Sequence, residues 1–162
     1  MAHFFSFKPL LFQLGGVCLL GFLSLTQVKA ENTVNWPQFR GPGASGVAEG
    51  VATPTTWNVP ESSNLKWKTP IPGLGHSCPI VWEDRLFLTT AISDKKLDSL
   101  KIGIYHEIAP VEKDGVHAWV LYCIDKSTGK VIWERVCHKG VPKDKRHTKS
   151  SHANCTPATD GK

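Results

Sequence analysis

One short segment in the second half of the chain carries the strongest structural signal. It reads Leu121-Tyr122-Cys123-Ile124-Asp125-Lys126-Ser127-Thr128-Gly129-Lys130-Val131-Ile132-Trp133. The first four residues suit a strand, Asp125 can end it by accepting hydrogen bonds from turn amides, and Gly129 supplies the positive φ of a tight turn. Trp133 follows where a large ring can cover the gap between neighbouring sheets. The segment therefore predicts an antiparallel β-hairpin.

The hairpin also predicts a register. With the turn over 125–130, Cys123 is placed opposite Ile132, and Cys137 is placed opposite Ala118. At about 3.3 Å per residue the two cysteines are roughly 16 Å apart, beyond the limit of about 7 Å between the Cα atoms of a disulfide. We therefore expect no bridge between Cys123 and Cys137.

Other parts of the chain read in the same way. Short runs of β-branched and aromatic residues between turn signals predict strands at 65–69, 79–91, 118–124 and 130–138. The best helical candidate is 96–104. Two polar and charged segments, 93–117 and 139–152, are interpreted as surface excursions. The fold class predicted from the residues is therefore all-β.

A short internal repeat supports a repeated architecture. Leu65-Lys66-Trp67-Lys68 aligns with Val131-Ile132-Trp133-Glu134, tryptophan on tryptophan. Each is followed by a small-polar segment that leads through a proline into a new strand, at 76–81 and at 153–159. Self-similarity of this kind indicates a repeat protein. Chance similarity between two β segments is the alternative.

The N-terminal part has a different character. Residues 1–30 have a basic start, an apolar run and the small residues Val28 and Ala30, which is the pattern of a secretory signal peptide cleaved after Ala30. An uncleaved anchor is the alternative. Residues 31–63 are rich in Pro, Gly, Ser and Thr and are predicted to be a coil or linker. We expect an exported protein, periplasmic or extracellular, that touches the membrane only transiently through the signal peptide.

The charge balance argues against nucleic acid as a partner. Cleavage would remove Lys8 and Lys29 and lower the formal net charge from +5 to +3. Five bases lie in one short segment: Lys139, Lys143, Lys145, Arg146 and Lys149. Such a run is usually a solvated surface.

Several of these segments resemble the tryptophan-docking repeat of the pyrroloquinoline-quinone (PQQ) binding-like β-propellers. The pattern is an apolar strand, Asp125, the Thr128-Gly129-Lys130 turn and Trp133, with Trp67 as the tryptophan of the preceding copy. Three further segments are also similar to this family: 35–42, 75–91 and 151–161. The departures are Cys78, Cys123 and Cys155, where the family usually has small residues.

The resemblance implies a β-propeller of four-stranded antiparallel blades, of which this chain would be an N-terminal fragment. Residues 64–162 would form the partial propeller. The segment 64–69 would be a ring-closing strand, about 79–137 would be blade one, and blade two would start from 153. A single blade cannot bury both faces of its sheet, so repeat proteins need about three or more units.

The resemblance also marks two candidate sites near the propeller axis. Cys78 and Cys155 precede equivalent inner strands and could form a disulfide, although free buried thiols are the favoured alternative. His76 and His152 could bind a metal or orient a substrate. Hydrogen bonding to loop backbone is favoured for them, because two imidazoles without a carboxylate are too few for a defined site.

Two functions follow from the resemblance. The first is a non-catalytic binding or scaffold module with no cofactor in this segment, which contacts proteins or cell-envelope components through the loops 93–117 and 139–152. The second is a quinoprotein alcohol or sugar dehydrogenase that holds PQQ with calcium. The first is favoured, because neither a vicinal cysteine pair nor acidic calcium ligands occur in this sequence.

Overall fold

The fold is given by a computed structural model that describes residues 34–95, 110–111 and 115–162. The predicted signal peptide at 1–30, most of the loop 93–117 and the helical candidate at 96–104 lie outside the described residues.

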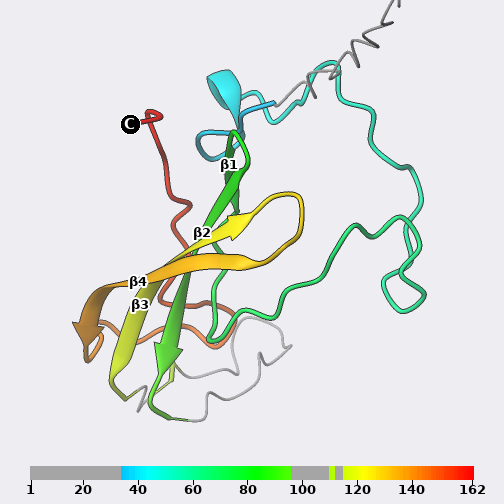
Figure 1. Ribbon diagram of the computed structural model, residues 1–162. Helices are drawn as coiled ribbons and strands as arrows, with labels where there is room; N and C mark the ends of the chain where they lie inside the picture. The colour runs from blue at the N-terminus through cyan, green and yellow to red at the C-terminus, as the bar shows by residue number, and fades with distance from the viewer. Residues whose placement is uncertain (1–33, 96–109, 112–114) are drawn as a thin grey trace, which may run out of the picture. The chain divides into compact units, whose positions relative to one another are not determined.

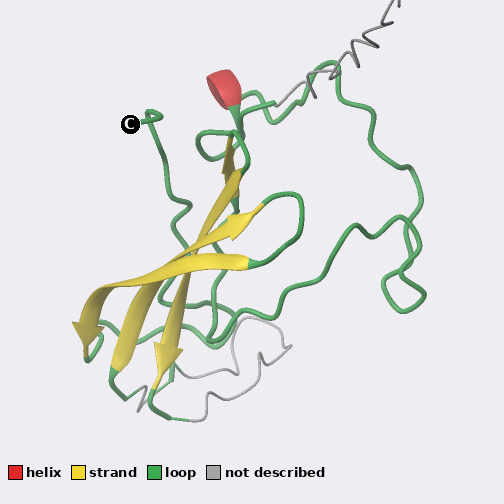
Figure 2. Cartoon of the chain, viewed as in Figure 1, coloured by secondary structure: helices red, strands yellow, loops and turns green. Residues whose placement is uncertain are grey.

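Four strands form a single open antiparallel sheet, and their spatial order is the chain order (Figure 1). The strands are β1 (Ile80–Trp82), β2 (Arg85–Ser93), β3 (His117–Asp125) and β4 (Val131–Gly140). The described helix is one short 3-10 turn, η1 (Pro42–Ala44), and Figure 2 shows that loops make up the rest. The prediction of a β-rich chain is confirmed.

The segment 79–91 was predicted as one strand and is a hairpin instead. β1 and β2 pair antiparallel, with Trp82 opposite Arg85, so the chain reverses at Glu83 and Asp84. Glu83 has a positive φ of 53°. Its N–H donates to the side-chain oxygen of Asn35 at 2.7 Å. The turn is thus held by a residue far away in sequence, and no local glycine or proline signals it.

The predicted register of the second hairpin is wrong beyond its turn. Cys123 pairs with Trp133 instead of Ile132, and Ala118 pairs with Lys139 instead of Cys137. The register shifts twice, so Ile132 and Cys137 are each an extra residue on β4. An extra residue that faces no partner is a β-bulge, which bends the strand and redirects side chains.

The core lies on one face of β3. Val120, Tyr122 and Ile124 form a buried cluster. The partly buried side chains that pack on it are Trp67, Ile71, Leu86, Leu88, Ile92 and Ala118. β4 differs, because nine of its ten residues are exposed.

Two predicted segments run as coil. Residues 65–69 are not a strand, because they form no ladder with any described residue. Residues 153–162, predicted to begin a second blade, also have no strand. Both segments are held by hydrogen bonds that involve side chains, described below.

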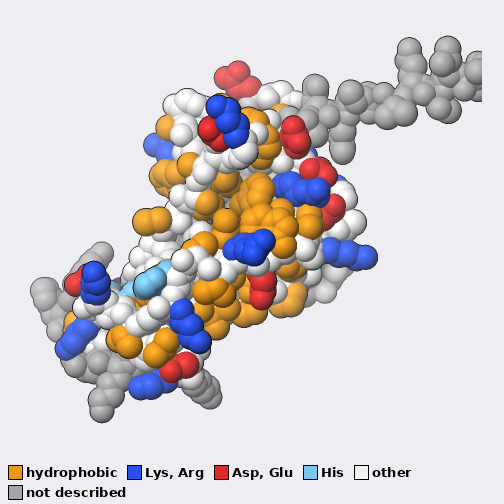
Figure 3. Space-filling view, turned by 60° about the vertical axis from the view of Figure 1, so that its left-hand side comes forward, with side chains coloured by type: hydrophobic (Ala, Val, Ile, Leu, Met, Phe, Trp, Pro, Cys, Tyr) orange, Lys and Arg blue, Asp and Glu red, His pale blue; other side chains and the backbone are white. Residues whose placement is uncertain are grey.

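The loop 139–152 is not wholly a solvated excursion. β4 extends to Gly140, and Arg146, Thr148 and Ser151 are buried. The Arg146 guanidinium donates to the Ser150 carbonyl at 3.3 Å. The other bases of this run are exposed. On the face drawn in Figure 3, basic side chains are scattered among acidic ones.

Candidate functional site

The turn between β3 and β4 is built around one carboxylate. The Asp125 Oδ1 atom accepts hydrogen bonds from the backbone N–H groups of Ser127 (3.0 Å) and Thr128 (2.7 Å). It also accepts from the hydroxyls of the same two residues, at 2.6 and 2.8 Å. The Gly129 N–H donates to the Asp125 carbonyl at 2.8 Å, and Gly129 has a φ of 72°. The predicted roles of Asp125 and Gly129 are confirmed.

These hydrogen bonds favour the ionised form of the carboxyl group. Donation by the side chains of Ser127 and Thr128, and then by the Thr128 N–H, lowers the pKa of Asp125 from 3.8 to about 2. The turn therefore keeps its charged acceptor through the whole neutral and mildly acidic range.

Trp67 docks on this turn from a distant part of the chain. Its indole N–H donates to the Lys126 carbonyl at 2.9 Å, across 59 residues of sequence. The Thr69 hydroxyl donates to the Gly129 carbonyl. The coil at 65–69 is therefore attached to the sheet by an indole and a hydroxyl, in place of a strand ladder.

The indole ring lies directly against Gly129. A Cβ atom added to this glycine would lie 2.5 Å from the Trp67 ring, closer than such atoms approach in proteins. Glycine is thus required here for contact with the ring as well as for its positive φ.

Two other tryptophans meet glycines in the same way. The Trp36 ring lies against Gly41, where an added Cβ would come within 2.5 Å. The Trp82 ring lies against Gly161, at the end of the chain. Gly41 and Gly161 also have positive φ angles, of 68° and 85°. A tryptophan seated on a positive-φ glycine is thus a recurring local structure in this chain.

Trp133 has a different environment. The residue is 39% exposed, and its ring centre lies 6.0 Å from that of Phe87. Within the described residues, no glycine has the Trp133 ring among its nearest contacts. Docking by Trp133 stays a prediction.

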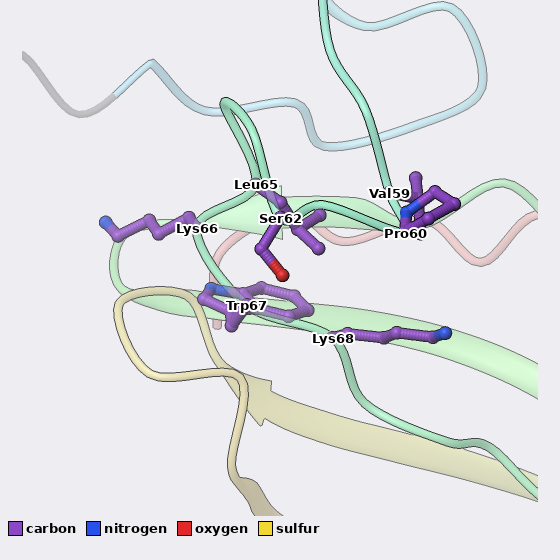
Figure 4. Close-up of a pocket in the computed structure, with 7 residues that line it drawn as sticks. All are labelled: Val59, Pro60, Ser62, Leu65, Lys66, Trp67 and Lys68. Carbon is purple, nitrogen blue, oxygen red and sulfur yellow. The ribbon is translucent and has the colours of Figure 1, made fainter.

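A cavity of about 550 Å³ lies on the Trp67 side of the turn. Its lining comprises Val59, Pro60, Ser62, Leu65, Lys66, Trp67 and Lys68. Figure 4 shows the Ser62 side chain directed at the indole ring, with the two lysines extending away on either side. The docked Trp67 ring is thus part of the lining of this cavity.

The two histidines singled out by sequence have different neighbours. His76 Nδ1 lies 3.3 Å from the side-chain oxygen of Asn154, a hydrogen bond when that nitrogen is protonated. The His76 N–H donates to the Ala153 carbonyl at 3.0 Å. The His152 ring instead packs edge-on against the buried His117, 5.0 Å between ring centres. Whether the pair binds a ligand stays a prediction.

The cysteines differ in burial. Of the four cysteines within the described residues, Cys123 is buried, while Cys78, Cys137 and Cys155 are exposed, and all four are free thiols. Burial raises the pKa of the Cys123 thiol. The expectation that Cys78 and Cys155 are buried is therefore wrong, since both are exposed. The Cys78 N–H donates to the Thr156 hydroxyl at 3.1 Å, so Cys78 lies beside the segment that carries Cys155. The Cys78–Cys155 bridge stays a prediction.

Some residues that take part in these contacts were not predicted from the sequence. Thr69 and the Lys126 carbonyl complete the attachment of the coil at 65–69 to the turn, yet neither has a distinctive sequence pattern. The contact of Trp82 with Gly161 was also missed, although Asp160-Gly161 is an Asp-Gly turn signal. Trp119 was also missed, and its indole N–H donates to the His152 carbonyl at 2.8 Å.

In the part of the chain that the structure describes, no group of three or more His, Cys, Asp or Glu side chains is arranged to hold a metal ion. No helix within the same described ranges has the length and apolar character needed to cross a membrane.

Comparison of the chain with protein-family models, with curated proteins and with solved structures found no match.

Proposed function

We propose that this chain is an exported β-propeller repeat protein of the PQQ-binding-like type, acting as a non-catalytic binding or scaffold module. The observation that carries the proposal is the docking of Trp67 on the turn that ends at Gly129. The sheet adds support, since four antiparallel strands in chain order are the composition of one propeller blade.

The exposed ring of Trp133 is the second support. Trp133 occupies the position in its segment that Trp67 occupies in the earlier copy. Trp67 is seated on a glycine-bearing turn, whereas Trp133 is 39% exposed on β4. Trp133 docks on the corresponding turn of a neighbouring blade, so that stacking of blades covers the exposed apolar side chains of β4.

The loop 139–152 supplies the binding surface. Its backbone is held by buried side chains such as Arg146 and Ser151, so its exposed lysines are displayed on a fixed support. Lys143 lies at the exposed part of this segment. Acidic groups on a protein or another envelope component complement such a surface.

Site-specific photo-crosslinking in living cells tests this role. A photoreactive residue at Lys143 is expected to give discrete crosslinked products in the cell envelope. The same residue at Glu61, exposed on the turn at 58–63, is the matched control and is expected to give none. Equal products from both positions would contradict a specific surface on the loop.

A second measurement addresses the dehydrogenase alternative. The full chain is titrated with PQQ in the presence of calcium, and tryptophan fluorescence is followed. A scaffold gives no saturable change. Saturation at one PQQ per chain would overturn the non-catalytic proposal.

A further inference from the structure

A second, smaller cavity brings two cysteines together from distant segments. Its volume is about 190 Å³, and it shares no residue with the cavity at Trp67. The lining consists of Thr89, Trp119, Val120, Cys137, His152, Ala153 and Cys155. Two cysteines and a histidine are thus among its lining residues.

Cys137 reaches this cavity because of a bulge. The register passes from Val120 opposite Val136 to Trp119 opposite His138, so Cys137 is the extra residue on β4. Bulges redirect side chains and are common beside functional sites. Without the bulge Cys137 would face a partner on β3 as an ordinary strand residue.

Cys155 is held from the other side by hydrogen bonds. The Thr89 hydroxyl donates to the Cys155 carbonyl at 3.1 Å. The Trp119 indole N–H donates to the carbonyl of His152, three residues earlier, at 2.8 Å. The segment 152–155 is therefore fixed over β2 and β3 at two points.

We propose that Cys137 and Cys155 together bind one soft monovalent metal ion, of the Cu(I) class, in this cavity. Thiolates are soft ligands that select Cu(I), zinc and iron–sulfur clusters. Structural zinc sites take four ligands, whereas Cu(I) is satisfied by two thiolates. On binding, each thiol forms a sulfur–metal bond and releases its proton to solvent, and the metal keeps its oxidation state.

The site and the candidate Cys78–Cys155 disulfide exclude each other, because both use Cys155. A Cys78–Cys155 bridge would remove one ligand from the metal. Binding must therefore be measured on reduced protein. Cys18 lies in the predicted signal peptide, outside the described residues, and is replaced by serine so that uncleaved chain carries no additional exposed thiol.

The test is a competition titration of the full reduced Cys18→Ser chain with Cu(I), without oxygen, against the chelator bathocuproine disulfonate. One Cu(I) per chain is expected. Cys137→Ser and Cys155→Ser should each weaken binding by at least about 100-fold, more than the loss of an outer-shell partner. Cys78→Ser is the control, an exposed cysteine outside the cavity, and should leave binding unchanged.

A second measurement uses the Cys18→Ser chain with both cavity cysteines intact, so its result does not depend on whether the cavity variants fold. Bound Cu(I) should protect Cys137 and Cys155 from alkylation and leave Cys78 reactive, as read by peptide mass spectrometry. The proposal is overturned if Cu(I) protects all exposed cysteines alike or none, or if Cys78→Ser weakens binding as much as the two cavity variants.

Discussion

Gly129 meets two requirements at a single residue, a φ of 72° and an indole ring against its Cα. Gly129→Ala is expected to cost about 2–4 kcal/mol of unfolding free energy, from backbone strain and from overpacking. Gly43→Ala is the matched control, because Gly43 has a φ of 60° and open space where a Cβ would be. It should cost only about 1–2 kcal/mol. Chemical denaturation measures both, and equal costs would contradict the ring contact.

The Asp125 carboxylate gives the turn a pH dependence. The folded-state pKa is lowered from 3.8 to about 2, so this stabilisation is complete above the unfolded value and is lost as the pH falls from about 4 toward 2. The side chain of Asp125→Asn cannot titrate, so the melting temperature of this variant should depend less on pH in this window. The readout is thermal unfolding of both proteins between pH 2 and pH 6, in steps of about half a unit. An unchanged slope in the variant would count against Asp125.

The thiols should separate by reactivity. Burial raises the pKa of Cys123, so little of this thiol is ionised near neutral pH. In reduced native protein, Cys78, Cys137 and Cys155 should react with a thiol reagent, and Cys123 should react only after denaturant is added. Rapid labelling of Cys123 in the native state would show that β3 is not buried as described.

At the scale of elements, the second hairpin was predictable and the first was not. The turn at Asp125 and Gly129 is built from local hydrogen bonds, so the residues of the turn predict it. The turn at Glu83 depends on Asn35, which is distant in sequence. The two bulges on β4 depend likewise on how the sheet packs, and sequence alone placed Cys137 in the wrong register.

Two tryptophans in aligned segments should differ in their contribution to stability. Trp67→Ala removes a docked ring and its hydrogen bond, and should cost about 3–5 kcal/mol. Trp133 is 39% exposed, so Trp133→Ala in this chain should cost less, about 1–2 kcal/mol. Urea unfolding compares the two variants. A larger cost for Trp133 would contradict the assignment of Trp67 as the docked ring.

At the scale of the whole molecule, hydrogen bonds made by side chains connect segments that form no β-ladder with each other. Trp67 links the coil at 65–69 to the sheet, and Thr89 links the segment at 155 to β2. The motif residues Asp125, Gly129 and Trp67 could be identified from sequence. The position of Cys137 and Cys155 on the lining of one cavity could not be predicted, because it depends on the bulge in β4 and on the path of the segment 152–155.

The central claim is that the contact between the Trp67 ring and Gly129 stabilises the fold, and a double-mutant cycle tests it most directly. Unfolding free energies are measured for Trp67→Ala, Gly129→Ala and the double variant. If the ring causes the cost at Gly129, that cost should fall in the Trp67→Ala background to the cost of Gly43→Ala, a coupling of at least about 1 kcal/mol. Costs that add to within about 0.5 kcal/mol would show that the two residues are independent and would contradict the account.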